Sequence, residues 1–171
     1  MRSFLAAACA AALATFPGGT TGLLPAWAHE AQCPFCRLDV VQDTPEQDNE
    51  VVLRYGKKRI EYRCVYCALA HARTEFTGDL IILAPSEIKG KPVVLSRKEG
   101  RWAVMPETAL FLAAKAEHRQ CAVAYRAFTG RAGFEAYLKR HAALLGEAKP
   151  LSLAQMVEAA KEPLPAAKEA P

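Results

Sequence analysis

The sequence lacks both a long apolar run and the short motifs of nucleotide and hydrolase chemistry. Its N-terminal apolar stretch, Phe4 to Phe16, has thirteen residues, whereas a helix that spans a membrane needs about 20. The chain contains no Gly-x-Gly-x-x-Gly fingerprint, no phosphate-binding loop and no Gly-x-Ser-x-Gly elbow. A permanent transmembrane helix, nucleotide binding and serine hydrolase chemistry are therefore not predicted.

The sequence also lacks a strong charge of one sign. It has 22 Lys and Arg against 18 Asp and Glu, a net charge of +4. A surface dedicated to nucleic acid would cluster its positive charge. The local basic run from Arg54 to Arg63 falls in a predicted hairpin, where such residues are typical of a solvated face and its turn. We therefore do not expect a nucleic acid as partner.

The N-terminal residues 1–28 resemble a secretory signal. Arg2 provides the positive charge, the Phe4 to Phe16 stretch the apolar region, and Ala26-Trp27-Ala28 a small-x-small cleavage site. Cys9 ends a stretch that resembles a lipoprotein box, but it lies too close to the start to leave an apolar segment before it, so a lipid anchor is not expected. The sequence thus predicts an exported, periplasmic protein.

The remaining chain divides by composition into a domain and a tail. Residues 29–146 have the mixed composition of a packed domain, whereas residues 147–171 are rich in Ala, Lys, Glu and Pro. Such a composition is typical of a flexible segment. We expect this tail to be available for contact with a partner or for peripheral association with a membrane surface.

Cysteine carries the main functional signal. Two Cys-x-x-Cys pairs, Cys33-Pro34-Phe35-Cys36 and Cys64-Val65-Tyr66-Cys67, are separated by twenty-seven residues. A two-residue gap lets two thiolates converge on one ion, so four sulfurs can complete a tetrahedral shell around Zn²⁺ or bind Cu(I) as soft ligands. His71 follows one helical turn after Cys67 and is a candidate fifth ligand or a donor to a thiolate.

Two other interpretations of these cysteines stay open. In an oxidising compartment the pairs could form two disulfides, with Cys121 as a buried thiol. A pair that closes on itself stabilises little, however, and is typical of redox or metal sites. Cys-Pro-Phe-Cys also looks like a glutaredoxin motif, but that motif follows a buried strand, and here it comes four residues after the predicted cleavage site.

Hydrophobic patterning predicts an α+β fold in which β-hairpins lead into helices, giving ββα-like units with two Cys-x-x-Cys knuckles. Met105 is expected in the core. The expected strands are 50–55, 59–63, 79–84 (buried on both faces), 91–95, 102–105 and 121–125. The expected helices run from the second knuckle to about 77, over 106–115, from about 133 to 145, and weakly over 151–161.

From Cys33 to about Leu145 the sequence resembles the NosL-type family of exported copper-handling proteins, which are accessory factors of nitrous oxide reductase. Three stretches carry this resemblance: Cys33 to Val40, where the family has Cys-x-x-Cys-Gly-Met, Tyr62 to His71, and Cys121 to Leu138. The resemblance implies ββα units, Cu(I) bound through Cys33 and Cys36, and a copper-receiving or copper-donating partner among the assembly factors of nitrous oxide reductase.

The chain departs from that family at two places. Arg37-Leu38 stands where the family has Gly-Met, so the thioether ligand is missing, and Cys64 and Cys67 add a second full pair. Either the added thiols replace the methionine in a Cu(I) site, or a structural Zn²⁺ site has taken over. The sequence predicts a Cu(I) carrier that is not an enzyme. The alternatives are a binding domain with structural zinc and a thiol-disulfide oxidoreductase.

Overall fold

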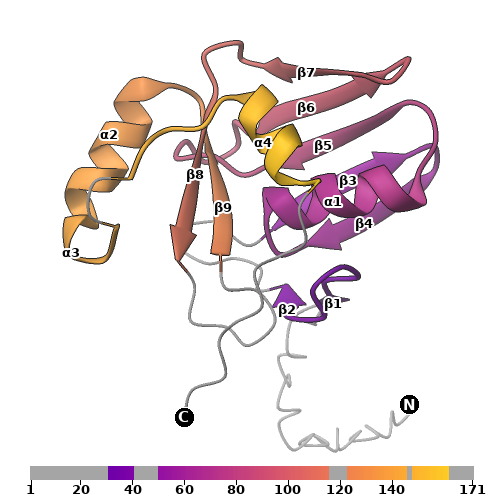
Figure 1. Cartoon of the computed structure of the whole chain (residues 1–171), viewed down its shortest axis with the longest axis horizontal. Helices are drawn as coiled ribbons and strands as arrows, with labels where there is room; N and C mark the ends of the chain where they lie inside the picture. The colour runs from indigo at the N-terminus through magenta and orange to yellow at the C-terminus, as the bar shows by residue number, and fades with distance from the viewer. Residues whose placement is uncertain (1–30, 41–49, 116–122, 146–147, 162–171) are drawn as a thin grey trace, which may run out of the picture.

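The computed structural model describes residues 31–40, 50–115, 123–145 and 148–161. It confirms the predicted α+β class, with antiparallel sheets and interspersed helices (Figure 1). The predicted signal segment 1–28, Cys121 and the last ten residues lie outside the described residues. The elements in chain order are β1 (Ala31–Gln32), β2 (Asp39–Val40), β3 (Val51–Tyr55), β4 (Lys58–Tyr62), α1 (Val65–Glu75), β5 (Leu80–Ala84), β6 (Val93–Lys98), β7 (Arg101–Met105), β8 (Leu110–Lys115), β9 (Val123–Phe128), α2 (Arg131–Arg140), α3 (Ala142–Leu145) and α4 (Leu153–Ala159).

A five-stranded antiparallel sheet forms the centre of the molecule, with the strand order β4-β3-β5-β6-β7. The predicted hairpin of β3 and β4 is confirmed, with Leu53 opposite Ile60 and Val51 opposite Tyr62. Gly56 makes its turn at a φ of 58°, a conformation that costs glycine little because it has no Cβ. There are two smaller sheets, β1-β2, which contacts β4, and β8-β9, which contacts α1, α2 and α4.

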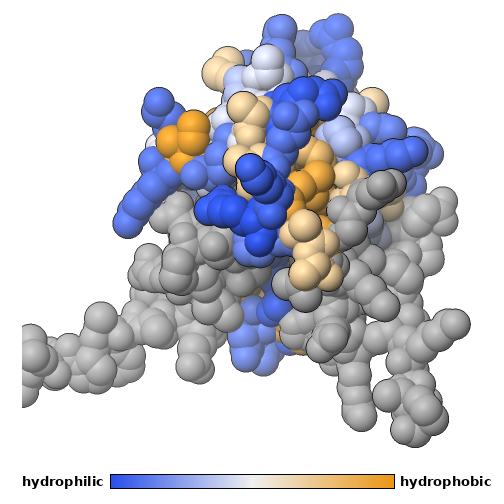
Figure 2. Space-filling model, turned by 90° about the vertical axis from the view of Figure 1, so that its left-hand side faces the viewer, coloured by the Kyte–Doolittle hydropathy of each residue, from blue (hydrophilic) through white to orange (hydrophobic). Residues whose placement is uncertain are grey.

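Helix α1 packs on β3, β4 and β9, and α4 lies beside α1, β7 and β8 (Figure 1). The core between the helices and the sheet is apolar and fully buried, and it includes Leu53, Ile82, Val93, Leu95 and Met156. A second, smaller cluster joins α2 to the β8-β9 hairpin. Figure 2 views the molecule from the α2 side, where most of the coloured surface is hydrophilic and a small apolar area lies among these residues. None of the described helices is long and apolar enough to cross a membrane.

The predicted helix over 106–115 is wrong, because Leu110–Lys115 forms strand β8. Its Leu, Ala and Lys residues favour a helix by propensity. In the structure the strand pairs with β9 along its whole length, from Leu110 opposite Phe128 to Lys115 opposite Val123. Pairing and burial of Phe111 and Leu112 therefore outweigh the local preference.

Strand β5 is present as predicted, but it is not buried on both faces. Leu80, Ile82 and Ala84 are buried, whereas Ile81 between them is 42% exposed. This alternation marks a strand with one face toward the core. Met105 is also not in the core: it ends the edge strand β7 and is 70% exposed.

The weak helix predicted near residues 151–161 is present as α4, and it packs into the domain. Ser152 caps it in a capping box with Gln155, which satisfies the first backbone N–H groups of the helix. Met156 is fully buried, and Leu151 exchanges two backbone hydrogen bonds with Phe111. The packed fold thus includes residues that the composition assigns to the tail after 146.

Candidate metal centre

The four cysteines of the two pairs lie in two distant segments that the fold brings together. Cys33 and Cys36 sit in the turn between β1 and β2, and Cys64 and Cys67 at the start of α1. All four are thiols, not disulfides, and they are 0%, 6%, 1% and 0% exposed, respectively. The sulfurs of Cys33, Cys36 and Cys67 all lie within 4.8 Å of one another. We call these three the sulfur trio.

The first pair is shaped by a tight turn. The N–H of Arg37 donates to the carbonyl of Cys33 over 2.8 Å, and the N–H of Cys33 donates to the carbonyl of Leu38, also over 2.8 Å. Arg37 takes the left-handed conformation, with a φ of 63°, which glycine adopts more readily. The turn folds the chain back on itself so that the sulfurs of Cys33 and Cys36 face the same side.

The second pair is shaped by the start of α1. Cys64 is the N-cap residue, with extended backbone, and the helix begins at Val65. Cys67 is therefore the third helical residue, on the side of the helix that the N-cap side chain reaches. The sulfurs of Cys64 and Cys67 lie 3.5 Å apart. Cys64 thus contacts one member of the sulfur trio, although it does not belong to the group of mutually close sulfurs.

His71, the predicted fifth ligand, is not part of the sulfur trio. Its Nδ1 atom lies 2.7 Å from the hydroxyl of Tyr62, in a hydrogen bond between α1 and the end of β4. Its ring also packs edge-on against Phe76, with centroids 5.7 Å apart. The structure therefore places His71 among aromatic rings, which include Phe35 of the first cysteine turn at a centroid distance of 6.5 Å.

Tyr62 is a site residue that the cysteine spacing did not reveal. It is fully buried, and burial raises the pKa of its hydroxyl well above the usual value, with further increases from nearby Cys33, Cys67 and Glu75. The hydroxyl therefore keeps its proton near neutral pH and can donate it to Nδ1 of His71. The available sequence signal is the alternation of β4, which puts Tyr62 on the same face as Ile60.

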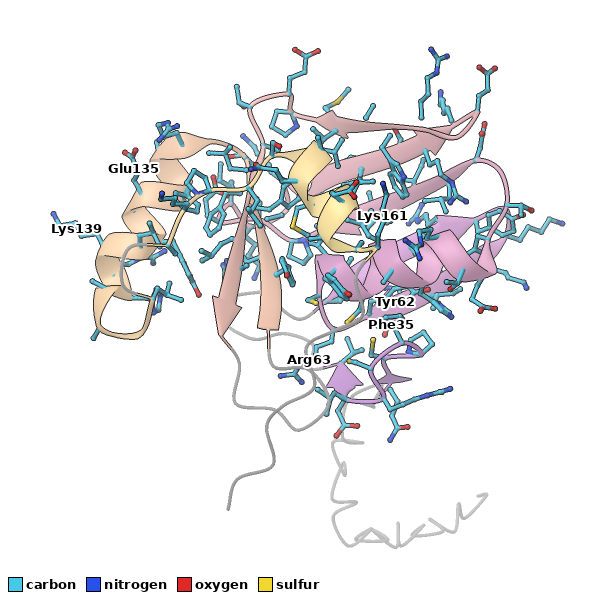
Figure 3. All side chains as sticks on the ribbon, in the orientation of Figure 1. Phe35, Tyr62, Arg63, Glu135, Lys139 and Lys161 are labelled. Atoms are coloured by element: carbon cyan, nitrogen blue, oxygen red, sulfur yellow. The ribbon has the colours of Figure 1, made fainter. Side chains whose placement is uncertain are left out.

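Aromatic contacts dock the first cysteine turn onto α1. Phe35 meets Tyr66 edge-on with centroids 6.0 Å apart, and Tyr66 stacks on Tyr125 of β9 at 5.1 Å. Arg63 adds a hydrogen bond of 3.2 Å to the carbonyl of Asp39 in β2. In Figure 3, Phe35, Tyr62 and Arg63 lie where the β1-β2 hairpin meets α1. These contacts explain why sulfurs from distant parts of the sequence converge.

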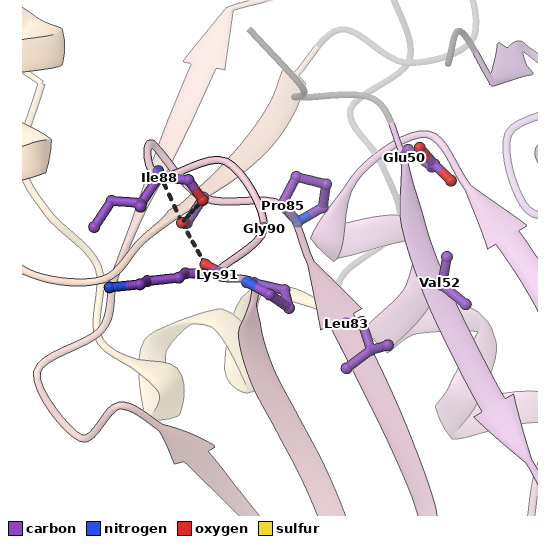
Figure 4. Close-up of a pocket in the computed structure, with 9 residues that line it drawn as sticks. Glu50, Val52, Leu83, Pro85, Ile88, Gly90 and Lys91 are labelled. Carbon is purple, nitrogen blue, oxygen red and sulfur yellow. Dashed lines mark hydrogen bonds between the residues drawn. The ribbon is translucent and has the colours of Figure 1, made fainter. Parts of the chain in front are cut away.

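A shallow groove lies elsewhere on the molecule (Figure 4). It is lined by Glu50, Val52, Leu83, Pro85, Ser86, Ile88, Gly90, Lys91 and Pro92. Val52 and Leu83 are paired neighbours on β3 and β5, and they alternate with the core residues Leu53 and Ile82. Their side chains therefore project from the sheet face opposite α1, and the groove is separate from the cysteine site.

Comparisons with known proteins bear on the fold. No protein-family description and no curated protein matches the sequence, so the resemblance to the NosL-type family stays a prediction. The structure is similar to the crystal structure of the mercury-bound form of MerB2, with a TM-score of 0.54 and 13% identity over 66% of this chain. The match covers 56% of that protein. At this identity the similarity shows a shared fold, while the cysteine cluster of this chain suggests a metal-binding role.

Proposed function

We propose that the protein is a carrier of Cu(I), which the thiolates of Cys33, Cys36 and Cys67 hold and then pass to another protein. The observation that carries this proposal is the buried sulfur trio, with all three sulfurs within 4.8 Å. Soft thiolate ligands suit Cu(I), Zn²⁺ and iron–sulfur clusters rather than hard cations. Structural Zn²⁺ almost always takes four protein ligands, so three sulfurs suit Cu(I) better than Zn²⁺.

Two further observations support a soft metal. The resemblance to NosL-type proteins, strongest at Cys33 to Val40, favours copper and a partner among the nitrous oxide reductase assembly factors. The fold is shared with MerB2, whose structure contains mercury, another soft metal. Under this proposal the protein works after export to the periplasm, with a copper-donating or copper-receiving protein as its partner.

Transfer of the metal requires exchange of ligands and no covalent change in a substrate. Cys36 is the most exposed member of the sulfur trio, at 6%. A thiolate, thioether or imidazole of the partner would therefore replace Cys36 first and the two fully buried sulfurs later. Since the metal only changes ligands, the protein would act as a carrier and not as an enzyme.

Native mass spectrometry of the oxygen-free protein tests this proposal. The protein is supplied with Cu(I) and with Zn²⁺ in turn, and each loaded form is then mixed with a competing chelator. We expect one Cu(I) per chain, removed by the chelator while circular dichroism shows that the chain stays folded. Absence of Cu(I) binding by the fully reduced chain would overturn the proposal.

A structural Zn²⁺ site is the second candidate, because the sulfur of Cys64 is only 3.5 Å from that of Cys67. A small side-chain rotation could bring Cys64 in as a fourth ligand. The energy of binding would then be folding energy. In the same experiment, this candidate predicts one Zn²⁺ whose removal unfolds the chain.

A further inference from the structure

We infer that Cys64 and Cys67 form a reversible disulfide that switches the metal site off. Their sulfurs lie 3.5 Å apart, and a disulfide needs about 2 Å, so modest side-chain rotation closes the gap. The inference rests on the proposed function, since the disulfide acts by withdrawing Cys67 from the sulfur trio. It assigns to Cys64 a role that metal ligation by the trio leaves open.

The second pair suits this chemistry better than the first. Cys64 follows strand β4 closely and is the N-cap residue of the eleven-residue helix α1. A Cys-x-x-Cys pair between a strand and a helix is typical of redox-active pairs. Cys33 and Cys36 lie in a turn between two strands of two residues each. Both of these cysteines also belong to the sulfur trio, whereas Cys64 supplies a sulfur that the trio does not use.

Metal binding and disulfide formation exclude each other at Cys67. The thiolate is the form of cysteine that binds a metal, and a sulfur engaged in a disulfide has no thiolate to offer. Oxidation therefore reduces the trio to two ligands, Cys33 and Cys36. Conversely, a bound metal occupies the sulfur of Cys67 and protects it from oxidation.

The oxidant in this step is a small disulfide such as glutathione disulfide. The thiolate of Cys64 attacks one of its sulfurs, forms a mixed disulfide and releases one glutathione thiolate. The thiolate of Cys67 then attacks the sulfur of Cys64, forms the Cys64–Cys67 bond and releases the second glutathione. The protein loses two electrons and two protons, which the two departing glutathione molecules receive.

Peptide mapping after equilibration with glutathione and glutathione disulfide tests the switch. Trypsin cleaves after Arg63 and Arg73, so both cysteines fall in the one peptide 64–73. With the metal-free, full-length protein we expect this peptide to become lighter by two hydrogen atoms. Cu(I) affinity should fall more than about 100-fold. Removing a residue that only hydrogen-bonds to a metal ligand lowers affinity by about 10–100-fold, and removing the ligand itself should lower it further. Added reductant should restore it, and bound Cu(I) should prevent the oxidation.

Cys64→Ser is the matched control, because serine is a good N-cap residue and keeps the start of α1. This variant should bind Cu(I) like the parent when reduced, and should keep that affinity after treatment with the oxidant. A thermal melt checks that it folds. The proposed switch is wrong if this variant loses Cu(I) as the parent does, or if the parent's disulfide maps to the peptide that ends at Arg37. The proposed carrier function is unaffected by either result. If the reduced parent binds no Cu(I), the carrier itself fails.

Discussion

At the scale of single residues, the site depends on buried sulfurs and on the polar atoms placed beside them. The Cys-x-x-Cys spacing identified the four cysteines, because the two-residue gap is a local property of the chain. It did not reveal that Cys64 lies outside the sulfur trio, or that His71 bonds to Tyr62. Those outcomes depend on the residue at which α1 begins and on how the helix packs on β4, which are tertiary properties.

Replacing Tyr62 with Phe should lower the free energy of unfolding by about 1–2 kcal/mol, because Nδ1 of His71 loses its partner next to the core. Tyr55→Phe is the matched control: its hydroxyl donates to the carbonyl of Thr77 over 2.7 Å at an exposed site. We expect the control to cost less than about 0.5 kcal/mol. Urea unfolding of both variants measures the difference. Equal losses of unfolding free energy would show that the Tyr62–His71 hydrogen bond contributes no more to stability than the exposed Tyr55–Thr77 bond.

The raised pKa of Tyr62 predicts a pH dependence of the metal-free protein. In the unfolded chain tyrosine ionises near pH 10, whereas burial raises the pKa of Tyr62 in the folded state. Above about pH 10 the unfolded state therefore loses a proton that the folded state keeps, so stability falls as the pH rises. Unfolding curves at several pH values should show a smaller fall for Tyr62→Phe. Parallel curves for the two proteins would contradict this attribution.

At the scale of elements, the second cysteine pair lies at the start of α1, with Cys64 as its N-cap residue and Cys67 in its first turn, and a buried arginine contacts the other end of the helix. Arg97 extends from β6 and donates to three backbone carbonyls, those of Ala72 (3.0 Å), Phe76 (2.8 Å) and Gly78 (2.9 Å). The carbonyls at the end of a helix have no partner within the helix. Arg97 thus ties the C-terminal end of α1 to the central sheet.

Replacing Arg97 with Met keeps the apolar stem and removes the guanidinium. We expect a loss of about 2–4 kcal/mol, because bonds from a charged donor are the stronger kind and the carbonyls stay near the core. Arg101→Met is the control, since Arg101 pairs with Glu99 where the side chains are 86% and 83% exposed. Its loss should stay below about 0.5 kcal/mol. Similar unfolding midpoints for the two variants would contradict the role of Arg97.

Helix α4 offers a comparison between two methionines. Met156 is fully buried in the core, whereas Met105 is 70% exposed at the edge of the sheet. Met156→Ala should cost about 2–5 kcal/mol through lost apolar contact and the cavity left behind. Met105→Ala should change stability by less than about 0.5 kcal/mol. Thermal unfolding of both variants decides whether α4 is part of the cooperative fold, and a Met156→Ala variant as stable as the parent would show that it is not.

At the scale of the whole molecule, the α+β class and the β3-β4 hairpin were predictable from alternating β-branched and aromatic residues. The start of α1 was predictable from the second knuckle. The strand at Leu110–Lys115 was not, because its residues favour a helix and only pairing with β9 makes it a strand. The packing of α4 was missed for a related reason: its composition resembles a solvated segment, and its burial depends on the surface formed by α1, β7 and β8.

The convergence of the sulfur trio is likewise a property of the whole molecule. Cys67 reaches Cys33 and Cys36 because Phe35 docks the first turn on Tyr66 of α1, and Tyr66 is held by Tyr125 of β9. Three segments that are distant in sequence therefore set the geometry of one site. The spacing of the cysteines predicted that a metal could be bound, but the number of sulfurs that meet follows from this packing.

The Cu(I) affinity of four single serine variants, measured by chelator competition under reducing conditions, tests the sulfur trio most directly. We expect replacement of Cys33, Cys36 or Cys67 to weaken binding more than about 100-fold, whereas Cys64→Ser should change it less than about 10-fold. Circular dichroism confirms that each variant is folded. Four equal losses would point to a four-sulfur site, and unchanged affinity in the three trio variants would show that the metal binds elsewhere.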